Sequence, residues 1–256
     1  MTLSCELPTS KATIGAATSV LNLLPHIAGF AVGFSGLAYI SGWREVSSYY
    51  QELGAPWVLP LLTASQVMQT SIWLISLISI VSFISVLSLV EGSVSQKWLR
   101  RWSIIFLLFA TVTFVLPFSL DGRVSASVIN FLTGVTSIFW AISAGFTIGE
   151  LIACLALDKL EWGDYHIFLL YFVVFYGFHQ APSNMGRTRA TLAVELKSSS
   201  LPKVDFVSPQ QSGDWRLVGP CGDKLLLVSL AKEYKDRRFK LVSSESIDEI
   251  HTHGHK

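Results

Sequence analysis

Two ionisable side chains lie inside long apolar stretches of the chain, and they are the residues best placed to carry chemistry. Glu150 is the only acidic residue within residues 127–157, and His26 is the only acidic or basic residue within residues 20–43. Each lies about six or seven residues from the same end of its expected helix, so we expect both at a similar depth, about 10 Å below the surface. A buried Glu–His pair at that depth could relay protons or switch with pH.

The alternative interpretation is structural. Glu150 would be neutral and hydrogen-bonded to a hydroxyl, or reached by water from the membrane interface. Substitution of Glu150 by Gln separates the two, because only the proton-relay hypothesis predicts that activity is lost while assembly is kept.

The residue patterns of known catalytic and metal sites are missing from the sequence. There is no Walker motif, HExxH, GxSxG or pair of intramembrane aspartates. Cys5, Cys154 and Cys221 are far apart and form no CxxC, which argues against a disulfide framework and a zinc site. The histidine-rich end, residues 251–256, is interpreted as a polar tail. We therefore expect no catalysis, no cofactor and no metal.

The composition places the chain in the membrane class. Hydrophobic residues make up 51% and charged residues only 14%, whereas a soluble domain carries roughly 25% charged residues. The net charge is +1, and no basic run with interleaved aromatic residues precedes the tail, so we expect no nucleic-acid partner.

The distribution of apolar residues predicts a polytopic α-helical membrane protein with about five spans, because about twenty apolar residues suffice to cross a bilayer. The expected spans cover residues 20–43, 70–90, 103–120, 127–157 and 165–181. Residues 1–19 form an N-terminal segment, and residues 20–182 form the transmembrane domain.

Small residues recur at every fourth position of the span at 127–157, which makes it the expected centre of the bundle. They are Ser137, Ala141, Gly145, Gly149 and Ala153. Residues four apart share one face of a helix, and small side chains let a second helix backbone approach closely. Gly29 and Gly33 make a GxxxG pair in the first span, so we expect this face to pack against Gly145 or Gly149.

Residues 44–69 form the longest connection between spans. Tyr49, Tyr50 and Trp57 are typical of the headgroup level. Gly54, Pro56 and Pro60 interrupt any helix, so the segment predicts a short amphipathic helix, a break and a second short helix.

The composition changes after Pro182. Residues 183–200 read as a linker, and residues 201–250 contain short strand-like runs separated by turn residues. The runs are 203–207, 215–218, 224–230 and 238–242, with a closing strand near Ile247 and Ile250. They predict a small antiparallel β-module, a meander or an SH3-like half barrel. Roughly fifty residues are marginal for independent stability, so the module should lean on another part of the protein.

Basic residues suggest the orientation in the membrane. The loop at residues 91–102 holds Lys97, Arg100 and Arg101, and by the positive-inside rule it is cytoplasmic. With about five spans, the N-terminus is then cytoplasmic and the β-module lies outside a bacterial cytoplasmic (inner) membrane.

Two functions from different classes fit these observations. The first is a membrane anchor, accessory subunit or immunity-type protective protein that binds a protein partner through residues 44–69 and 201–250. The second is a channel or transporter component that uses Glu150 and His26 in a proton or ion path. The second function requires a homo-oligomer, because about five spans are too few for most transporters.

Overall fold

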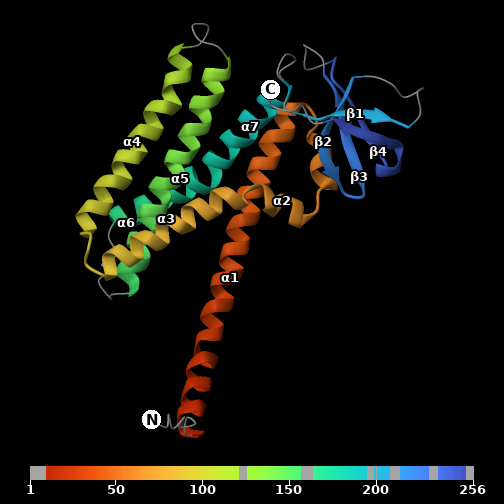
Figure 1. Cartoon of the computed structure of the whole chain (residues 1–256). Helices are drawn as coiled ribbons and strands as arrows, with labels where there is room; N and C mark the ends of the chain where they lie inside the picture. Colours follow the sequence, from red (N-terminus) through yellow and green to blue (C-terminus); the bar gives the residue numbers. More distant parts are fainter. Residues whose placement is uncertain are drawn as a thin grey trace, which may run out of the picture.

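The computed structural model describes residues 10–120, 126–156, 164–194, 199, 201–207, 214–230 and 236–251. Helices fill most of this chain, and a small antiparallel sheet lies at its C-terminal end (Figure 1). The expected fold class is confirmed in that respect. The helices are α1 (Ser10–Leu53), α2 (Ala64–Thr70), α3 (Ile72–Val90), α4 (Gln96–Leu120), α5 (Ala126–Ala156), α6 (Asp164–Val173) and α7 (Ala181–Val194), with the 3-10 helix η1 (Pro56–Leu61) and the π-helix η2 (Val174–Gln180).

Three helices of the described chain are long and apolar enough to cross a membrane, and the expectation of about five spans is corrected accordingly. They are α3, α4 from Gln96 to Leu116, and α5 from Val128 to Leu155. The expected first and fifth spans are not among them. In the expected first span, the side chains up to residue 31 lie outside the described residues, and in the expected fifth span α6 is only 10 residues long before the π-helical segment begins.

Helix α5 is the centre of the bundle, where it packs against α3, α4 and α7. Trp140, Ala141 and Ala144 are at most 2% exposed in the largest apolar cluster. Reciprocal hydrogen bonds join α4 to α5: Ser103 Oγ donates to the Ser143 carbonyl at 3.1 Å, and Ser143 Oγ donates to the Ser103 carbonyl at 2.9 Å. Such bonds hold membrane helices together where apolar burial gives no driving force.

The small residues of α5 lie at a close helix crossing, but the helix that they meet is α3. A Cβ at Gly145 would lie 2.7 Å from Val81 Cβ, and one at Gly149 would lie 2.5 Å from Ser85 Cβ. Gly33 has nothing within 4 Å of such a Cβ, so the expected crossing of the first helix with Gly145 or Gly149 is not observed. The side chain of His26 and the surroundings of Gly29 lie outside the described residues.

Helix α7 occupies most of the segment expected to be a linker. Its buried residues include the small Ala181, Ser183, Gly186 and Ala190, and the helix packs against α1 and α5. A Cβ at Gly186 would lie only 2.1 Å from the carbonyl oxygen of Glu45, so the two backbones touch there. A stripe of small residues supplies little hydropathy, which is why the sequence pattern resembled a linker.

The sheet contains the strands β1 (Lys203–Phe206), β2 (Trp215–Cys221), β3 (Lys224–Ser229), β4 (Arg238–Val242) and β5 (Ile247–His251), in the order β4-β3-β2-β1-β5. All neighbouring strands are antiparallel. The expected meander is confirmed, and β5 returns to pair with β1. Gly222, with φ +63°, makes the turn between β2 and β3.

Both faces of the sheet are covered. Along β3, Leu227 packs with Val204 and Val242 in a cluster within the module, whereas Leu226 packs with residues of α1 and η1. Val228 lies in a third cluster with Ala193 of α7. Alternate residues of a strand face opposite sides, so the second side of this small sheet is completed by the helices.

Candidate functional site

The end of α1 is fixed to the β-module by its own backbone. Gly54, with φ +98°, ends the helix, and Ala55 N–H donates to the Tyr50 carbonyl at 2.8 Å in a Schellman-type cap. The last carbonyls of a helix have no partner within it. Arg237, just before β4, donates from Nη1 to the carbonyls of Glu52 at 3.3 Å and Leu53 at 3.0 Å.

An apolar core lies beside this cap. Leu53, Val58 and Leu226 are all 0% exposed and come from α1, η1 and β3. Cys221 lies in the same cluster, and burial raises the pKa of its thiol. A buried thiol with a raised pKa is a poor nucleophile and a poor crosslinking group. The segments expected to bind a partner, 44–69 and 201–250, are thus packed against each other.

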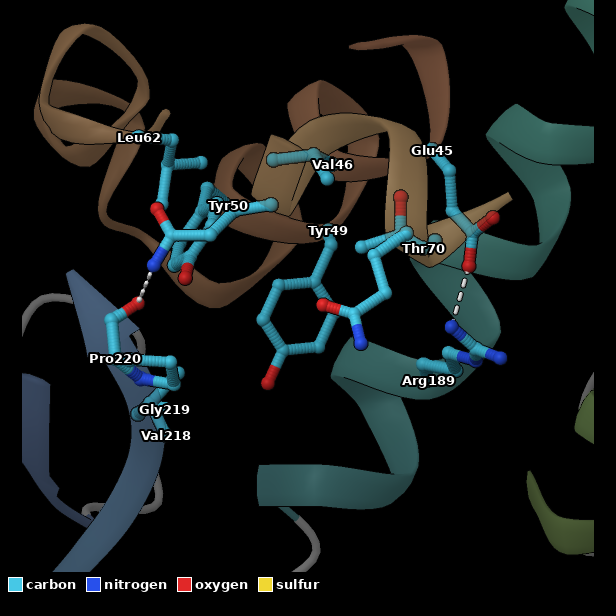
Figure 2. Close-up of a pocket in the computed structure, with 13 residues that line it drawn as sticks. Glu45, Val46, Tyr49, Tyr50, Leu62, Thr70, Arg189, Val218, Gly219 and Pro220 are labelled. Atoms are coloured by element: carbon cyan, nitrogen blue, oxygen red, sulfur yellow. Dashed lines mark hydrogen bonds and ion pairs between the residues drawn. The ribbon is translucent and has the colours of Figure 1, made fainter. Parts of the chain in front are cut away.

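A cavity of about 300 Å³ lies at the junction of α1, α2, α7 and β2, and we refer to it as the junction cavity. Tyr49 lies in its middle, with Tyr50 and Pro220 toward one end and Glu45 and Arg189 at the other (Figure 2). Cavities of this size, with apolar walls and a few polar groups, are typical of small-molecule sites. We take it as the candidate functional site.

Glu45 and Arg189 form an ion pair at one end of the cavity. Arg189 Nη1 donates to Glu45 Oε1 at 2.5 Å. Glu45 Oε2 is buried and has no hydrogen-bond partner among the described residues. Burial raises the pKa of Glu45 to about 7, although the Arg189 charge and hydrogen bond act in the opposite direction.

The two tyrosines act as neutral hydrogen-bonding groups. Burial raises the pKa of Tyr49 to about 12, and burial together with Tyr49 raises the pKa of Tyr50 as well. Both hydroxyls therefore keep their protons at neutral pH and can donate or accept a hydrogen bond. The arrangement is suited to binding, because the described lining combines these two hydroxyls with the Glu45–Arg189 pair and apolar walls.

Glu150 lies elsewhere, and its partners differ from the expected one. Arg100 Nε donates to Glu150 Oε1 at 2.6 Å, and Gln96 Nε2 donates to the same oxygen at 2.9 Å. Gln96 also contacts Cys154 Sγ at 3.3 Å. The cluster joins α4 to α5. The cation that pairs with Glu150 is therefore Arg100, which was expected to lie in the cytoplasmic loop.

The described part of the chain contains no group of three or more His, Cys, Asp or Glu residues suited to a metal ion. The three comparisons, with family models, curated proteins and solved structures, find no match to the chain.

Sequence reasoning missed the Glu45–Arg189 pair. The two residues are 144 positions apart, and each belonged to a segment read as a connection. One signal was present: charged Arg44 and Glu45 follow the first apolar stretch directly, with small serines on either side at Ser41 and Ser48. Ser48 Oγ lies 2.8 Å from Ser183 Oγ, which extends the polar contact between α1 and α7.

Proposed function

We propose that the protein is an integral membrane protein that acts by protein–protein interaction, as an anchor, an accessory subunit or an immunity-type protective protein. The observation that carries the proposal is that the 44–69 segment and the β-module pack together as one unit at the C-terminal end of α1. A module held by a buried core and by Arg237 can present a fixed surface to a partner.

The surface that we assign to the partner is formed by η1 and β4. Trp57 is 46% exposed and makes an edge-to-face contact with Phe239 at 6.3 Å, and Leu61, four residues later in η1, is 44% exposed. Exposed tryptophan next to apolar neighbours is the kind of residue that carries much of the affinity at protein interfaces.

The test is site-specific photocrosslinking from position 57 in native membranes. The expected result is one discrete crosslinked partner that is lost in Leu61→Ala. Ile250→Ala is the matched control, because Ile250 is also 46% exposed but lies on β5 at the opposite edge of the sheet. Crosslinks to lipid alone, or a partner lost equally in Ile250→Ala, would contradict the assignment. A toxin gene beside this gene would favour the protective form.

The orientation is part of the same proposal. Lys97 and Arg101 are exposed at the start of α4, at the end of the bundle away from the β-module, and the positive-inside rule places them in the cytoplasm. We therefore assign the β-module to the outside of a bacterial cytoplasmic membrane. A reporter enzyme that works only outside the cytoplasm should be active when it is fused after residue 256.

The transport alternative has less support from the geometry. Glu150 is only 6% exposed and its Oε1 accepts from both Arg100 and Gln96, which favours a structural role. Proton flux in liposomes that disappears in Glu150→Gln would reverse this preference.

A further inference from the structure

The accessible charge in the junction cavity is positive. The side chain of Arg189 is 47% exposed, whereas that of Glu45 is 2% exposed, although the two form one ion pair. Both residues line the cavity, and Arg189 is the more accessible of the two charged side chains. Arg189 Nη1 donates one hydrogen bond to Glu45, and this bond orients the guanidinium. The other N–H groups of the guanidinium can donate to an anion.

Further hydrogen-bonding groups of the lining are open. The hydroxyls of Tyr49 and Tyr50 and the amide of Gln69 have no hydrogen-bond partner among the described residues. By contrast, Gln66 is engaged, because its Oε1 accepts from Thr63 N–H and its Nε2 donates to the Pro220 carbonyl. The open groups surround the same space as Arg189.

The cavity also has an apolar wall, made by Val46, Leu62 and Val218. Its position along the chain is informative: Thr70 lines it, and the apolar span α3 begins at Ile72. A site two residues from the start of a span lies at the headgroup level, where phosphate is the abundant anion.

We propose that the junction cavity binds the phosphate group of an anionic amphiphile, with Arg189 as the anchor and the hydroxyls of Tyr49 and Tyr50 and the Gln69 amide as further donors. The apolar wall receives the first part of the attached chain. A phosphate ester could come from a phospholipid headgroup or from a soluble organophosphate, and the chemistry at Arg189 is the same for both. The proposal is independent of the protein partner proposed above, because the cavity and the Trp57 surface use different residues.

The test uses the full-length protein, purified in detergent, with lipid retention measured by native mass spectrometry. Phosphatidylglycerol should bind to the wild type about tenfold more tightly than to Arg189→Gln, as expected for loss of a charge-assisted bond. Tyr49→Phe, which removes one hydroxyl and keeps the ring, should weaken binding several-fold. Arg187→Gln is the matched control, because Arg187 is exposed on the same helix and does not line the cavity.

The arms of the experiment separate the two sources and the possible failures. Competition by soluble glycerol 3-phosphate assigns the site to a free organophosphate, and its absence assigns the site to the lipid. Equal binding in Arg189→Gln and the wild type, or equal losses in Arg189→Gln and Arg187→Gln, would overturn the proposal. If Arg189→Gln proves unstable, the double variant Glu45→Gln/Arg189→Gln removes both charges, and it must show the same loss of binding.

Discussion

Two regions of the molecule contain a buried carboxylate paired with an arginine, and they differ in what surrounds the pair. Glu150 joins α4 to α5 and accepts from Arg100 and Gln96. Glu45 joins α1 to α7, accepts from Arg189 on one oxygen, and has no partner in the described chain for the other. The first pair fastens two helices, whereas the second borders an open cavity.

The side chains of the two arginines also differ in exposure. Arg100 is 34% exposed and Arg189 47%, although the carboxylates are similarly buried at 6% and 2%. Glu150 has no buried polar atom left without a partner, as expected for a structural pair, whereas the buried and unsatisfied Glu45 Oε2 beside a cavity is typical of binding sites.

The largest expected effect comes from the glycine beside each carboxylate. Gly186→Ala places a Cβ 2.1 Å from the rigid Glu45 carbonyl oxygen, so we expect a loss of about 3 kcal/mol or more in the free energy of unfolding. Gly149→Ala meets Ser85 Cβ at 2.5 Å and should cost somewhat less. Gly134→Ala is the control, because nothing lies within 4 Å there. Thermal unfolding in detergent measures all three, and equal stability of the Gly186 and Gly134 variants would contradict the α1–α7 contact.

The arginines should rank next. Arg100→Gln leaves the buried Glu150 without its cation and should destabilise the protein by about 3 kcal/mol. Arg189→Gln should cost only about 1 kcal/mol, because the pKa of Glu45 is already about 7 and its carboxyl group can take up a proton when the cation is removed. The same unfolding measurement decides the order. A larger loss for Arg189→Gln than for Arg100→Gln would contradict the interpretation of Arg100–Glu150 as the structural pair and of Arg189–Glu45 as part of a binding site.

The pH dependence of stability should depend on Glu45. Its pKa is about 7 in the folded protein against 4.5 as the ordinary value, so the folded state binds more protons than the unfolded state between these values. Stability should therefore be highest below pH 4.5 on this account and fall as pH rises through 7, by on the order of 2 kcal/mol. Glu45→Gln should flatten this part of the profile. An unchanged slope in the variant would show that another group is responsible.

The smallest effect concerns the two described cysteines, one near each region. Cys154 is 7% and Cys221 3% exposed, so both should react slowly with a membrane-permeant maleimide in a Cys5→Ser background. Arg100→Gln should raise labelling of Cys154 by a modest factor, because the Gln96–Glu150 cluster beside it loosens. Labelling of Cys221 should not change in that variant. Equal changes at both cysteines would indicate general unfolding.

Much of the fold was predictable from local pattern. The strand at residues 238–242 has the predicted bounds, and the helix break at Gly54 lies where glycine and two prolines interrupt the chain. The central helix also matches closely, at Ala126–Ala156 against the predicted 127–157. These features depend on backbone preferences and on alternation within a few residues, which a sequence displays directly.

The errors have a common physical cause. Residues 183–194 looked like a linker because their packing face is made of small residues, whose contribution is close approach and not hydropathy. Pro182 lacks an N–H, and the Phe178 carbonyl four residues earlier accepts instead from Ser41 Oγ of α1 at 3.4 Å. Ser41 thus gives the Phe178 carbonyl the hydrogen bond that Pro182 cannot give, and only the tertiary structure brings Ser41 to that position.

The sequence by itself determined the class of the protein, an apolar helical chain with a small antiparallel module, because composition and periodicity act locally. Only the tertiary structure decided which charges meet. Arg100 reaches Glu150 across 50 positions, and Arg189 reaches Glu45 across 144. An ion pair depends on distance in space, and the chain brings these residues together only through the packing of α4 on α5, where Ser103 and Ser143 exchange hydrogen bonds, and of α7 on α1 at Gly186.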